Sequence, residues 1–189
     1  MKREFSLSRF LLTVLVVLVI CSLSVLGYFL NQKLTHEEKV ISNELLGNEY
    51  IHRHLAGFLE SVQQHRGLTT SYLSGNASFK EYCLAKQIEV ESVIRNADAF
   101  ELSYGGRLGT TENWKRIKAR WQELKGRVFS LSASENISEH AEFIRQTLAF
   151  FSYVTDASGL SLDSNLRTYY LMRLITSNLP YLSEYLGQM

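Results

Sequence analysis

The longest uncharged stretch of the sequence constrains the fold most. Residues 10–30 read FLLTVLVVLVICSLSVLGYFL and contain no charged side chain. At about 1.5 Å per helical residue, such a run covers about 30 Å, the thickness of the hydrocarbon core of a bilayer. The run therefore predicts a membrane-spanning helix. No later apolar run reaches a spanning length.

A cleavable signal peptide is the alternative interpretation of this run. Its apolar region normally has about 7 to 15 residues and ends at a small-x-small cleavage site, and the sequence meets neither condition cleanly, so we favour an uncleaved anchor. Three basic residues precede the run and only Lys33 follows it closely, which places the N-terminus in the cytoplasm. We expect a cytoplasmic tail (1–9), a single transmembrane helix (10–30) in the inner, cytoplasmic membrane, and a periplasmic or otherwise extracytoplasmic portion (31–189).

The rest of the chain has the pattern of long helices. It contains one proline and few glycines, and its apolar residues recur in steps of three and four. The fold class expected is all-α, with the transmembrane helix continuing outward into an extracytoplasmic antiparallel helical bundle. The first expected core stripe comprises Ile41, Leu45, Ile51, Leu55, Phe58, Val62, Thr69 and Tyr72. The most regular stripe comprises Trp114, Ile117, Trp121, Leu124, Val128 and Leu131.

Polar segments separate the expected helices. Ser78 and Glu81 have the spacing of a capping box that begins a second helix, SYGGRLGT (103–110) is the clearest loop, and SASENIS (132–138) is a further polar break. A fourth helix carries Phe143, Ile144, Leu148, Phe151 and Val154 and ends near Gly159. A fifth is expected to begin around residues 163–165, with a kink at Pro180; its stripe comprises Met172, Ile175, Leu179, Leu182 and Leu186.

Composition and motifs disfavour several function classes. The 20 Lys and Arg residues nearly balance the 19 Asp and Glu residues, so nothing favours nucleic acid as a partner. The phosphate-binding G-x-x-x-x-G-K motif, the G-x-S-x-G elbow and the H-E-x-x-H zinc helix are absent. His52 and His54 diverge on a helix, and Cys83 is expected to be a buried, unpaired thiol. We expect no enzyme activity, no metal site and no cofactor.

The segment SVQQHRGLTTSYLSGN (61–76) carries the most unusual residues. Steps of seven place His65 on a core-facing position with Arg66 beside it, and a buried His-Arg pair is costly unless its hydrogen bonds are accepted. The acceptor is either a neighbouring carboxylate, which we favour, or an anionic ligand held between helices. Gly67 weakens the helix and suggests close approach by a helix or a ligand. The candidate ligand contacts are His65, Arg66, Tyr72, Arg167 and Tyr169, each of which also has a structural interpretation.

Four segments together resemble a known group of receptors. They are QQHRGLTTSYLSGN (63–76), AKQIEVESVI (85–94), RWQELK (120–125) and ASGLSLDSNLRTYYLMRLITSNLPYLSEYLGQM (157–189). In this order they resemble the extracytoplasmic helical sensor region of bacterial transmembrane receptors, notably methyl-accepting chemotaxis proteins and membrane-bound diguanylate cyclases. The Gln-x-x-Arg-Gly element also resembles part of the nitrate- and nitrite-sensing helical domain.

The resemblance implies a sensory input module for signal transduction, embedded in the lipid bilayer and forming a homodimer, with a small anionic or polar ligand. In such receptors a second membrane helix leads to a cytoplasmic output domain. This sequence shows neither before Met189, so a receptor fragment, a truncated product and an anchored module that signals through a partner all remain open. The alternative from another class is a single-span scaffold or adaptor that binds a protein partner and no small molecule.

Overall fold

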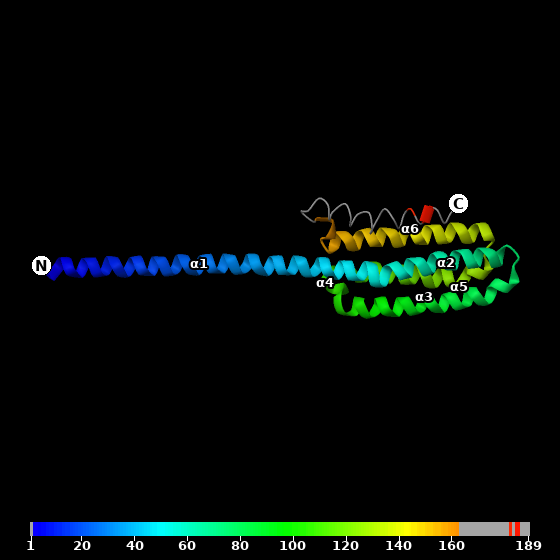
Figure 1. Ribbon diagram of the computed structural model, residues 1–189, viewed down its shortest axis with the longest axis horizontal. Helices are drawn as coiled ribbons and strands as arrows, with labels where there is room; N and C mark the ends of the chain where they lie inside the picture. Colours follow the sequence, from blue (N-terminus) through cyan, green and yellow to red (C-terminus); the bar gives the residue numbers. More distant parts are fainter. Residues whose placement is uncertain (1, 163–181, 183, 186–189) are drawn as a thin grey trace. The chain divides into compact units, whose positions relative to one another are not determined.

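The computed structural model describes residues 2–162, 182, 184 and 185, with side chains described from residue 10 onward (Figure 1). This part of the chain is helical and contains no strand, which confirms the all-α fold class for the described residues. The chain divides into two compact units, Met1–Ser42 and Asn43–Met189. Of the expected fifth helix the structure describes only residues 182, 184 and 185, and Pro180 lies outside the described residues. Leu182 is 53% exposed, so its expected place on a buried stripe is wrong.

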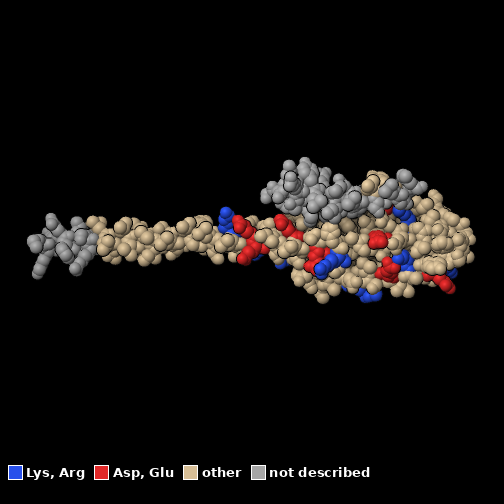
Figure 2. Space-filling view, in the orientation of Figure 1, with Lys and Arg blue, Asp and Glu red and all other residues tan. Residues whose placement is uncertain are grey.

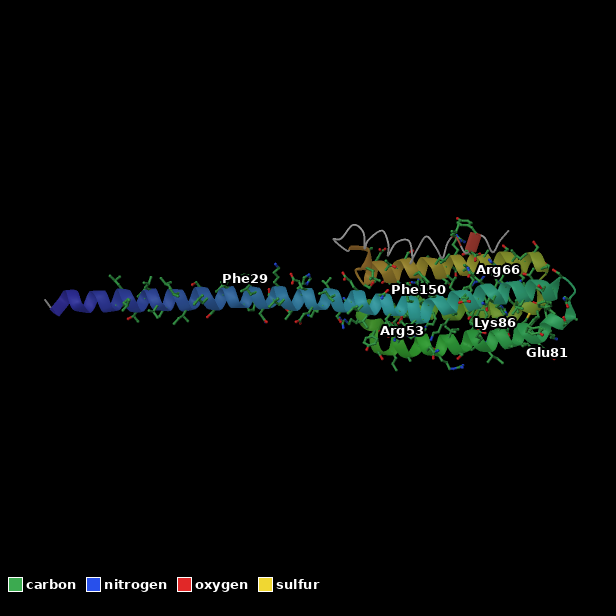
Figure 3. All side chains as sticks on the ribbon, viewed as in Figure 1. Phe29, Arg53, Arg66, Glu81, Lys86 and Phe150 are labelled. Atoms are coloured by element: carbon green, nitrogen blue, oxygen red, sulfur yellow. The ribbon has the colours of Figure 1, made fainter. Side chains whose placement is uncertain are left out.

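The first unit contains the apolar run. Residues 10–30 belong to helix α1 (Lys2–Glu49), and their large apolar side chains are exposed, as Phe10 (65%) and Phe29 (61%, labelled in Figure 3) illustrate. Residues 10–30 contain no Lys, Arg, Asp or Glu, so no blue or red atoms appear along them in Figure 2. Among the described residues one helix is long and apolar enough to cross a membrane, and its most apolar window has no buried residue. The core helix of a soluble protein would bury most of such a window.

The second unit is a set of helices joined by short turns. After the end of α1 come a π-helix, η1 (Tyr50–Leu55), and α2 (Ala56–Leu73), so the backbone is helical from Lys2 to Leu73. The remaining elements are η2 (Ala77–Phe79), α3 (Lys80–Phe100), the π-helix η3 (Glu101–Gly105), α4 (Gly106–Leu108), α5 (Thr111–Arg127), η4 (Val128–Ser130), α6 (Ala133–Ala157) and η5 (Leu160–Leu162). Helix α2 packs against both α3 and α6, and α5 packs against α6 (Figure 1).

Two of the expected apolar stripes are confirmed by burial. On α5, Trp114, Ile117, Trp121 and Leu124 are at most 6% exposed. Val128 of η4 is fully buried, and Leu131 packs against the core. On α6, the five expected residues from Phe143 to Val154 are at most 1% exposed. Aromatic rings form the centre of this core, for instance Phe58 edge-on to Trp114 at 5.5 Å. Cys83 is fully buried, as expected for a small apolar side chain.

The first stripe is wrong at its beginning, because Ile41 is 57% exposed and Leu45 is 64% exposed. Ile41 belongs to the first unit, in which the side chains of residues 10–41 are all exposed. The π-helix η1 explains the error at Leu45. Its hydrogen bonds join residues five apart instead of four, so it inserts an additional residue and changes which face of the helix meets the core. Ile51, Leu55, Phe58 and Val62 follow the expected stripe and are buried, whereas before η1 the buried position is Gly47.

The helix ends also differ from the expectation. Residues 103–108 are helical, and the chain turns only at Gly109, whose φ of 69° favours glycine. The capping box lies at Ser132, which forms reciprocal hydrogen bonds with Glu135 at the start of α6. The expected capping box at Ser78 is wrong, since its hydroxyl donates to Asn76 (2.7 Å). Residues 132–138 therefore begin a helix instead of breaking one.

The expectation that another helix approaches Gly67 closely is also wrong for the described residues. A Cβ at Gly67 would meet no atom within 4 Å. The close contact occurs at Gly47, where a Cβ would lie 2.1 Å from Ser158 Oγ. A glycine there lets the end of α1 approach the C-terminal end of α6.

Candidate functional site

Six polar side chains form a buried cluster in the second unit, which we call the polar layer. His65 and Thr69 lie one turn apart on α2, and Asn136 and His140 lie one turn apart on α6, so each pair projects from one side of its helix. Arg66 and Glu184 complete the layer. All six side chains are buried: His65, Arg66, Thr69, Asn136, His140 and Glu184.

One chain of hydrogen bonds assigns the proton positions of both histidines. His140 Nδ1 lies 2.9 Å from the Asn136 carbonyl oxygen, which only accepts, so Nδ1 carries the proton and donates. His140 Nε2 is then the acceptor for His65 Nδ1 at 2.9 Å. His65 Nε2 accepts in turn from the amide of Gln87 on α3 at 3.2 Å. The geometry thus suits two neutral imidazoles, and Trp121 packs edge-on to His65 at 5.1 Å.

The environment of the two histidines holds them in the neutral form. Burial, with a smaller contribution from the neighbouring His140, lowers the pKa of His65 to about 3. Burial, with a smaller contribution from the cation of Arg66, lowers the pKa of His140 to about 4. Three groups act on the pKa of His140 in the opposite direction: the Asn136 carbonyl, Glu139 and Glu184.

The acceptor for Arg66 is a carboxylate of the protein itself. Its guanidinium forms an ion pair with Glu184 Oε1, and both side chains are only 7% exposed (Arg66 is labelled in Figure 3). Gln63 Nε2 donates to the other carboxylate oxygen at 3.1 Å. The Gln-x-x-Arg spacing therefore directs two donors from one turn of α2 at one carboxylate, an arrangement suited to an oxyanion.

The hydroxyl and amide groups of the layer are also partnered. Thr69 Oγ1 lies 2.7 Å from the His65 carbonyl and 3.1 Å from Asn136 Oδ1. The Asn136 amide donates to Thr70 Oγ1 at 2.9 Å. No buried side-chain nitrogen or oxygen of the polar layer lacks a hydrogen-bond partner.

The structure brings together two of the five candidate residues that the sequence suggested, His65 and Arg66. Tyr72 is half-buried away from them and packs edge-on to Phe129 at 5.4 Å. Arg167 and Tyr169 lie outside the described residues.

Sequence reasoning missed three members of the layer. Asn136 and His140 precede Phe143 in steps of four and three, so extending the α6 stripe backward would have found them. Treating residues 132–138 as a break removed that signal. Glu184 has no comparable local pattern, because only the tertiary fold brings it to Arg66.

A second polar cluster, the π-helix cluster, comprises Tyr50 and His54 of η1 and Glu101 of η3. Burial raises the pKa of Tyr50 above its ordinary range, and the nearby Glu101 carboxylate raises it further. Yet Tyr50 Oη, His54 Nδ1 and Glu101 Oε2 make no hydrogen bond of acceptable geometry. Glu101 Oε1 accepts from the Thr110 hydroxyl at 2.7 Å. A Cβ at Gly105 would lie 1.9 Å from Glu101 Oε2, so this carboxylate requires a glycine beside it.

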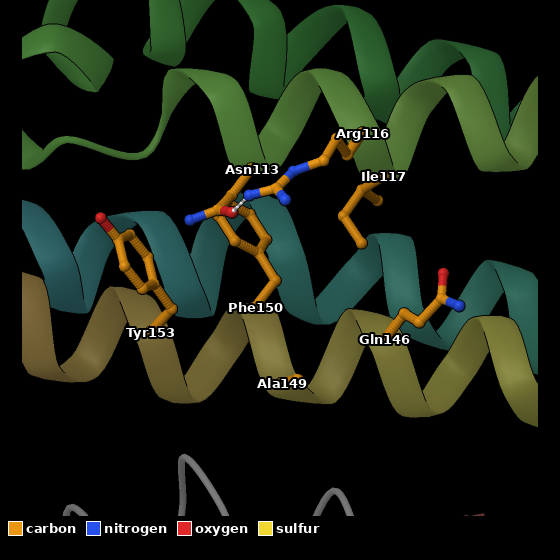
Figure 4. Close-up of a pocket in the computed structure, with 7 residues that line it drawn as sticks. All are labelled: Asn113, Arg116, Ile117, Gln146, Ala149, Phe150 and Tyr153. Carbon is orange, nitrogen blue, oxygen red and sulfur yellow. Dashed lines mark hydrogen bonds between the residues drawn. The ribbon is translucent and has the colours of Figure 1, made fainter.

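A groove of about 390 Å³ lies between α5 and α6. Figure 4 shows Arg116 and Asn113 of α5 above Phe150 of α6, with Tyr153 and Gln146 at opposite ends. Ile117 and Ala149 complete the lining. Its volume falls in the range of small-molecule sites, about 300 to 1,000 Å³.

The described residues define an all-α chain with one apolar helix and a buried polar layer. They hold no group of three or more His, Cys, Asp or Glu side chains arranged to bind a metal. No protein-family model, no curated protein and no solved structure matches the chain.

Proposed function

We propose that this chain is the sensory input module of a membrane-anchored signal-transduction receptor, similar to bacterial chemotaxis receptors. In this proposal the helices of the second unit form an antiparallel bundle on the periplasmic side, as a homodimer. The apolar run of α1 crosses the inner membrane once, with the N-terminus in the cytoplasm. A reporter fused after Met189 that proved cytosolic would overturn this orientation.

The single observation that supports the proposal is the convergence of Arg66 and Gln63 on a buried carboxylate. Buried cations need a partner, because desolvation of an unpaired charge is costly. Here the partner is Glu184, whose carboxylate has the shape and charge of a small oxyanion ligand. A ligand that replaced Glu184 would pair with Arg66 and so break the contact between α2 and the segment that carries Glu184. Two alternative partners for one cation provide the two packing states that a switch needs.

The backbone supplies a connection for the signal. Arg66 belongs to the same uninterrupted helical run, Lys2–Leu73, as residues 10–30. A change in the packing of α2 therefore acts on a helix that continues in sequence to the apolar segment. The energy available for that change is the difference in affinity of the ligand for the two packings. In this proposal the chain itself is not an enzyme.

The test uses the full chain in lipid nanodiscs and measures thermal stabilisation by nitrate, acetate, malate and aspartate. We expect at least one anion to stabilise the wild type and to stabilise Glu184→Gln at about tenfold lower concentration, because the competing carboxylate has been neutralised. Arg66→Lys keeps the charge but loses the planar donor pair, so it should respond more weakly than the wild type. Arg53→Gln is the matched control, since Arg53 is exposed and pairs with Glu49 one turn away in the same helical run.

The opposite results favour the scaffold or adaptor alternative. These are the absence of stabilisation by any of the four anions, or equal stabilisation of the wild type and Glu184→Gln. The observation that favours this alternative is the exposure of two large apolar side chains one turn apart on α3, Leu84 (43%) and Ile88 (69%). Exposed apolar side chains that lie together are typical of protein-binding surfaces.

A further inference from the structure

Helix α5 has six basic residues, and five of them form ion pairs. These pairs are Lys115 with Glu112, Lys118 with Asp98, Arg120 with Glu123 and Glu139, Lys125 with Glu91, and Arg127 with Glu123 and Glu139. Arg116 is the exception in the described part of the chain, because its guanidinium donates only to the side-chain oxygen of Asn113. That oxygen is neutral, so the charge of Arg116 is not matched by a carboxylate.

Arg116 stands at the rim of the groove between α5 and α6. The groove has an apolar floor, in which Ile117 is 6% exposed and Phe150 is 4% exposed. Ala149 adds a small side chain that leaves space above α6. No acidic side chain is among the lining residues. The groove therefore combines one cation with an apolar surface, and the carboxylate that acts on this cation, Glu112, does not line the groove.

We propose that this groove binds a small organic carboxylate with an apolar body, such as an aryl-alkanoate. The carboxylate pairs with the guanidinium of Arg116, whose planar donors match two carboxylate oxygens. The apolar body covers Ile117 and Phe150, and burial of that surface supplies most of the affinity. The site is separate from the polar layer, so it does not depend on Arg66 binding a ligand.

The floor of the groove connects the ligand to the π-helix cluster. Phe150 stacks on Trp114 at 6.1 Å and lies edge-on to Tyr50 of η1 at 6.0 Å. A ligand that presses on Phe150 therefore acts on the ring next to the unpartnered hydroxyl of Tyr50. Trp114 provides a built-in probe, because its fluorescence responds to the packing of Phe150.

The test is calorimetric titration of the full chain in nanodiscs with 3-phenylpropanoate, with empty nanodiscs as the reference for partition into lipid. For a ligand of this size we expect a Kd of about 0.1 to 1 mM. Arg116→Gln should weaken binding about tenfold or more, because the charge-assisted hydrogen bonds are lost. Ala149→Leu should abolish binding by filling the groove. Lys115→Gln is the matched control, since it removes an adjacent, 61% exposed cation that does not line the groove, and should change the Kd less than twofold.

Four results would overturn the proposal. The first is absence of binding to the wild type at 3-phenylpropanoate concentrations up to about ten times the expected Kd. The second is equal binding of the neutral isostere 3-phenylpropanamide, or an unchanged Kd in Arg116→Gln, because the cation would then have no role. The third is competition by acetate at the same concentration as 3-phenylpropanoate, because the apolar floor would then contribute nothing. Weak binding that is insensitive to Ala149→Leu would place the ligand elsewhere on the protein and would equally reject the groove.

Discussion

The polar layer and the π-helix cluster lie in the same helical unit, yet they differ in whether their buried polar atoms have hydrogen-bond partners. In the polar layer each histidine, amide and hydroxyl has a partner, and the charge of Arg66 meets that of Glu184. In the π-helix cluster, Tyr50 Oη and Glu101 Oε2 lie near each other without a good hydrogen bond. The layer joins regular α-helices, whereas the cluster joins two π-helices.

This difference shows which part of the second unit loses more stability when its packing changes without a ligand. As long as no ligand replaces Glu184, a fully partnered buried network holds one arrangement, because any shift leaves costly unpaired groups. A cluster with unpartnered atoms loses little when its helices shift. π-Helical turns are uncommon and occur frequently at functional sites. We therefore expect mutations in the polar layer to cost stability and mutations in the π-helix cluster to cost little.

The largest effect is expected for Arg66→Ala, which would leave the buried carboxylate of Glu184 without its cation. Loss of one partner of a buried ion pair costs about 3–5 kcal/mol. Arg145→Ala, which breaks an exposed pair, should cost less than about 0.5 kcal/mol. Urea unfolding of the full chain in detergent, followed by tryptophan fluorescence, measures both. Equal effects of the two substitutions would remove the distinction between the polar layer and the surface.

The next effect is the pH dependence of stability. His65 and His140 have pKa values lowered to about 3 and about 4 in the folded chain, whereas an unfolded histidine titrates near 6.5. Below pH 6.5 the unfolded state binds more protons than the folded state. The contribution of the two neutral histidines to the free energy of unfolding is therefore complete above pH 6.5 and is lost as the pH falls toward 4. We expect a loss of about 2 kcal/mol for each of the two histidines between pH 6.5 and 4.5.

The same unfolding experiment, repeated across this pH range, tests the expected loss. His52→Gln should leave the slope unchanged, because His52 is exposed. Constant stability from pH 6.5 to 4.5 would show that the two histidines are not a neutral, desolvated pair.

The smallest changes in stability are expected when one hydroxyl group is removed from each cluster. Thr69→Val in the polar layer should destabilise by about 1 kcal/mol, because it removes the donor that lies near Asn136 Oδ1 and the His65 carbonyl. Tyr50→Phe should leave stability within about 0.5 kcal/mol or increase it, since the hydroxyl that it removes has no hydrogen bond of good geometry. Unfolding midpoints at pH 7.5 give both values. A greater loss for Tyr50→Phe than for Thr69→Val would reverse the comparison.

The helices of this protein were predictable where the periodicity was regular. The stripes on α5 and α6 followed steps of three and four and are buried, because tertiary packing used the face that the sequence presents. The expectation failed at Leu45, which precedes the residue that η1 inserts. It failed again at residues 132–138, where a polar composition conceals a capped helix. Neither π-helices nor caps change the average polarity of a segment, so composition did not reveal them.

The sequence by itself determined that the chain is helical, that residues 10–30 are apolar enough to span a membrane, and that His65 is core-facing. These properties depend on local spacing and composition, which every window of residues carries. Only the tertiary structure decided that His65 meets His140, that Arg66 meets Glu184, and that Arg116 borders a groove on α6. These contacts join residues up to 118 positions apart. Their geometry depends on how whole helices pack, which no single segment encodes.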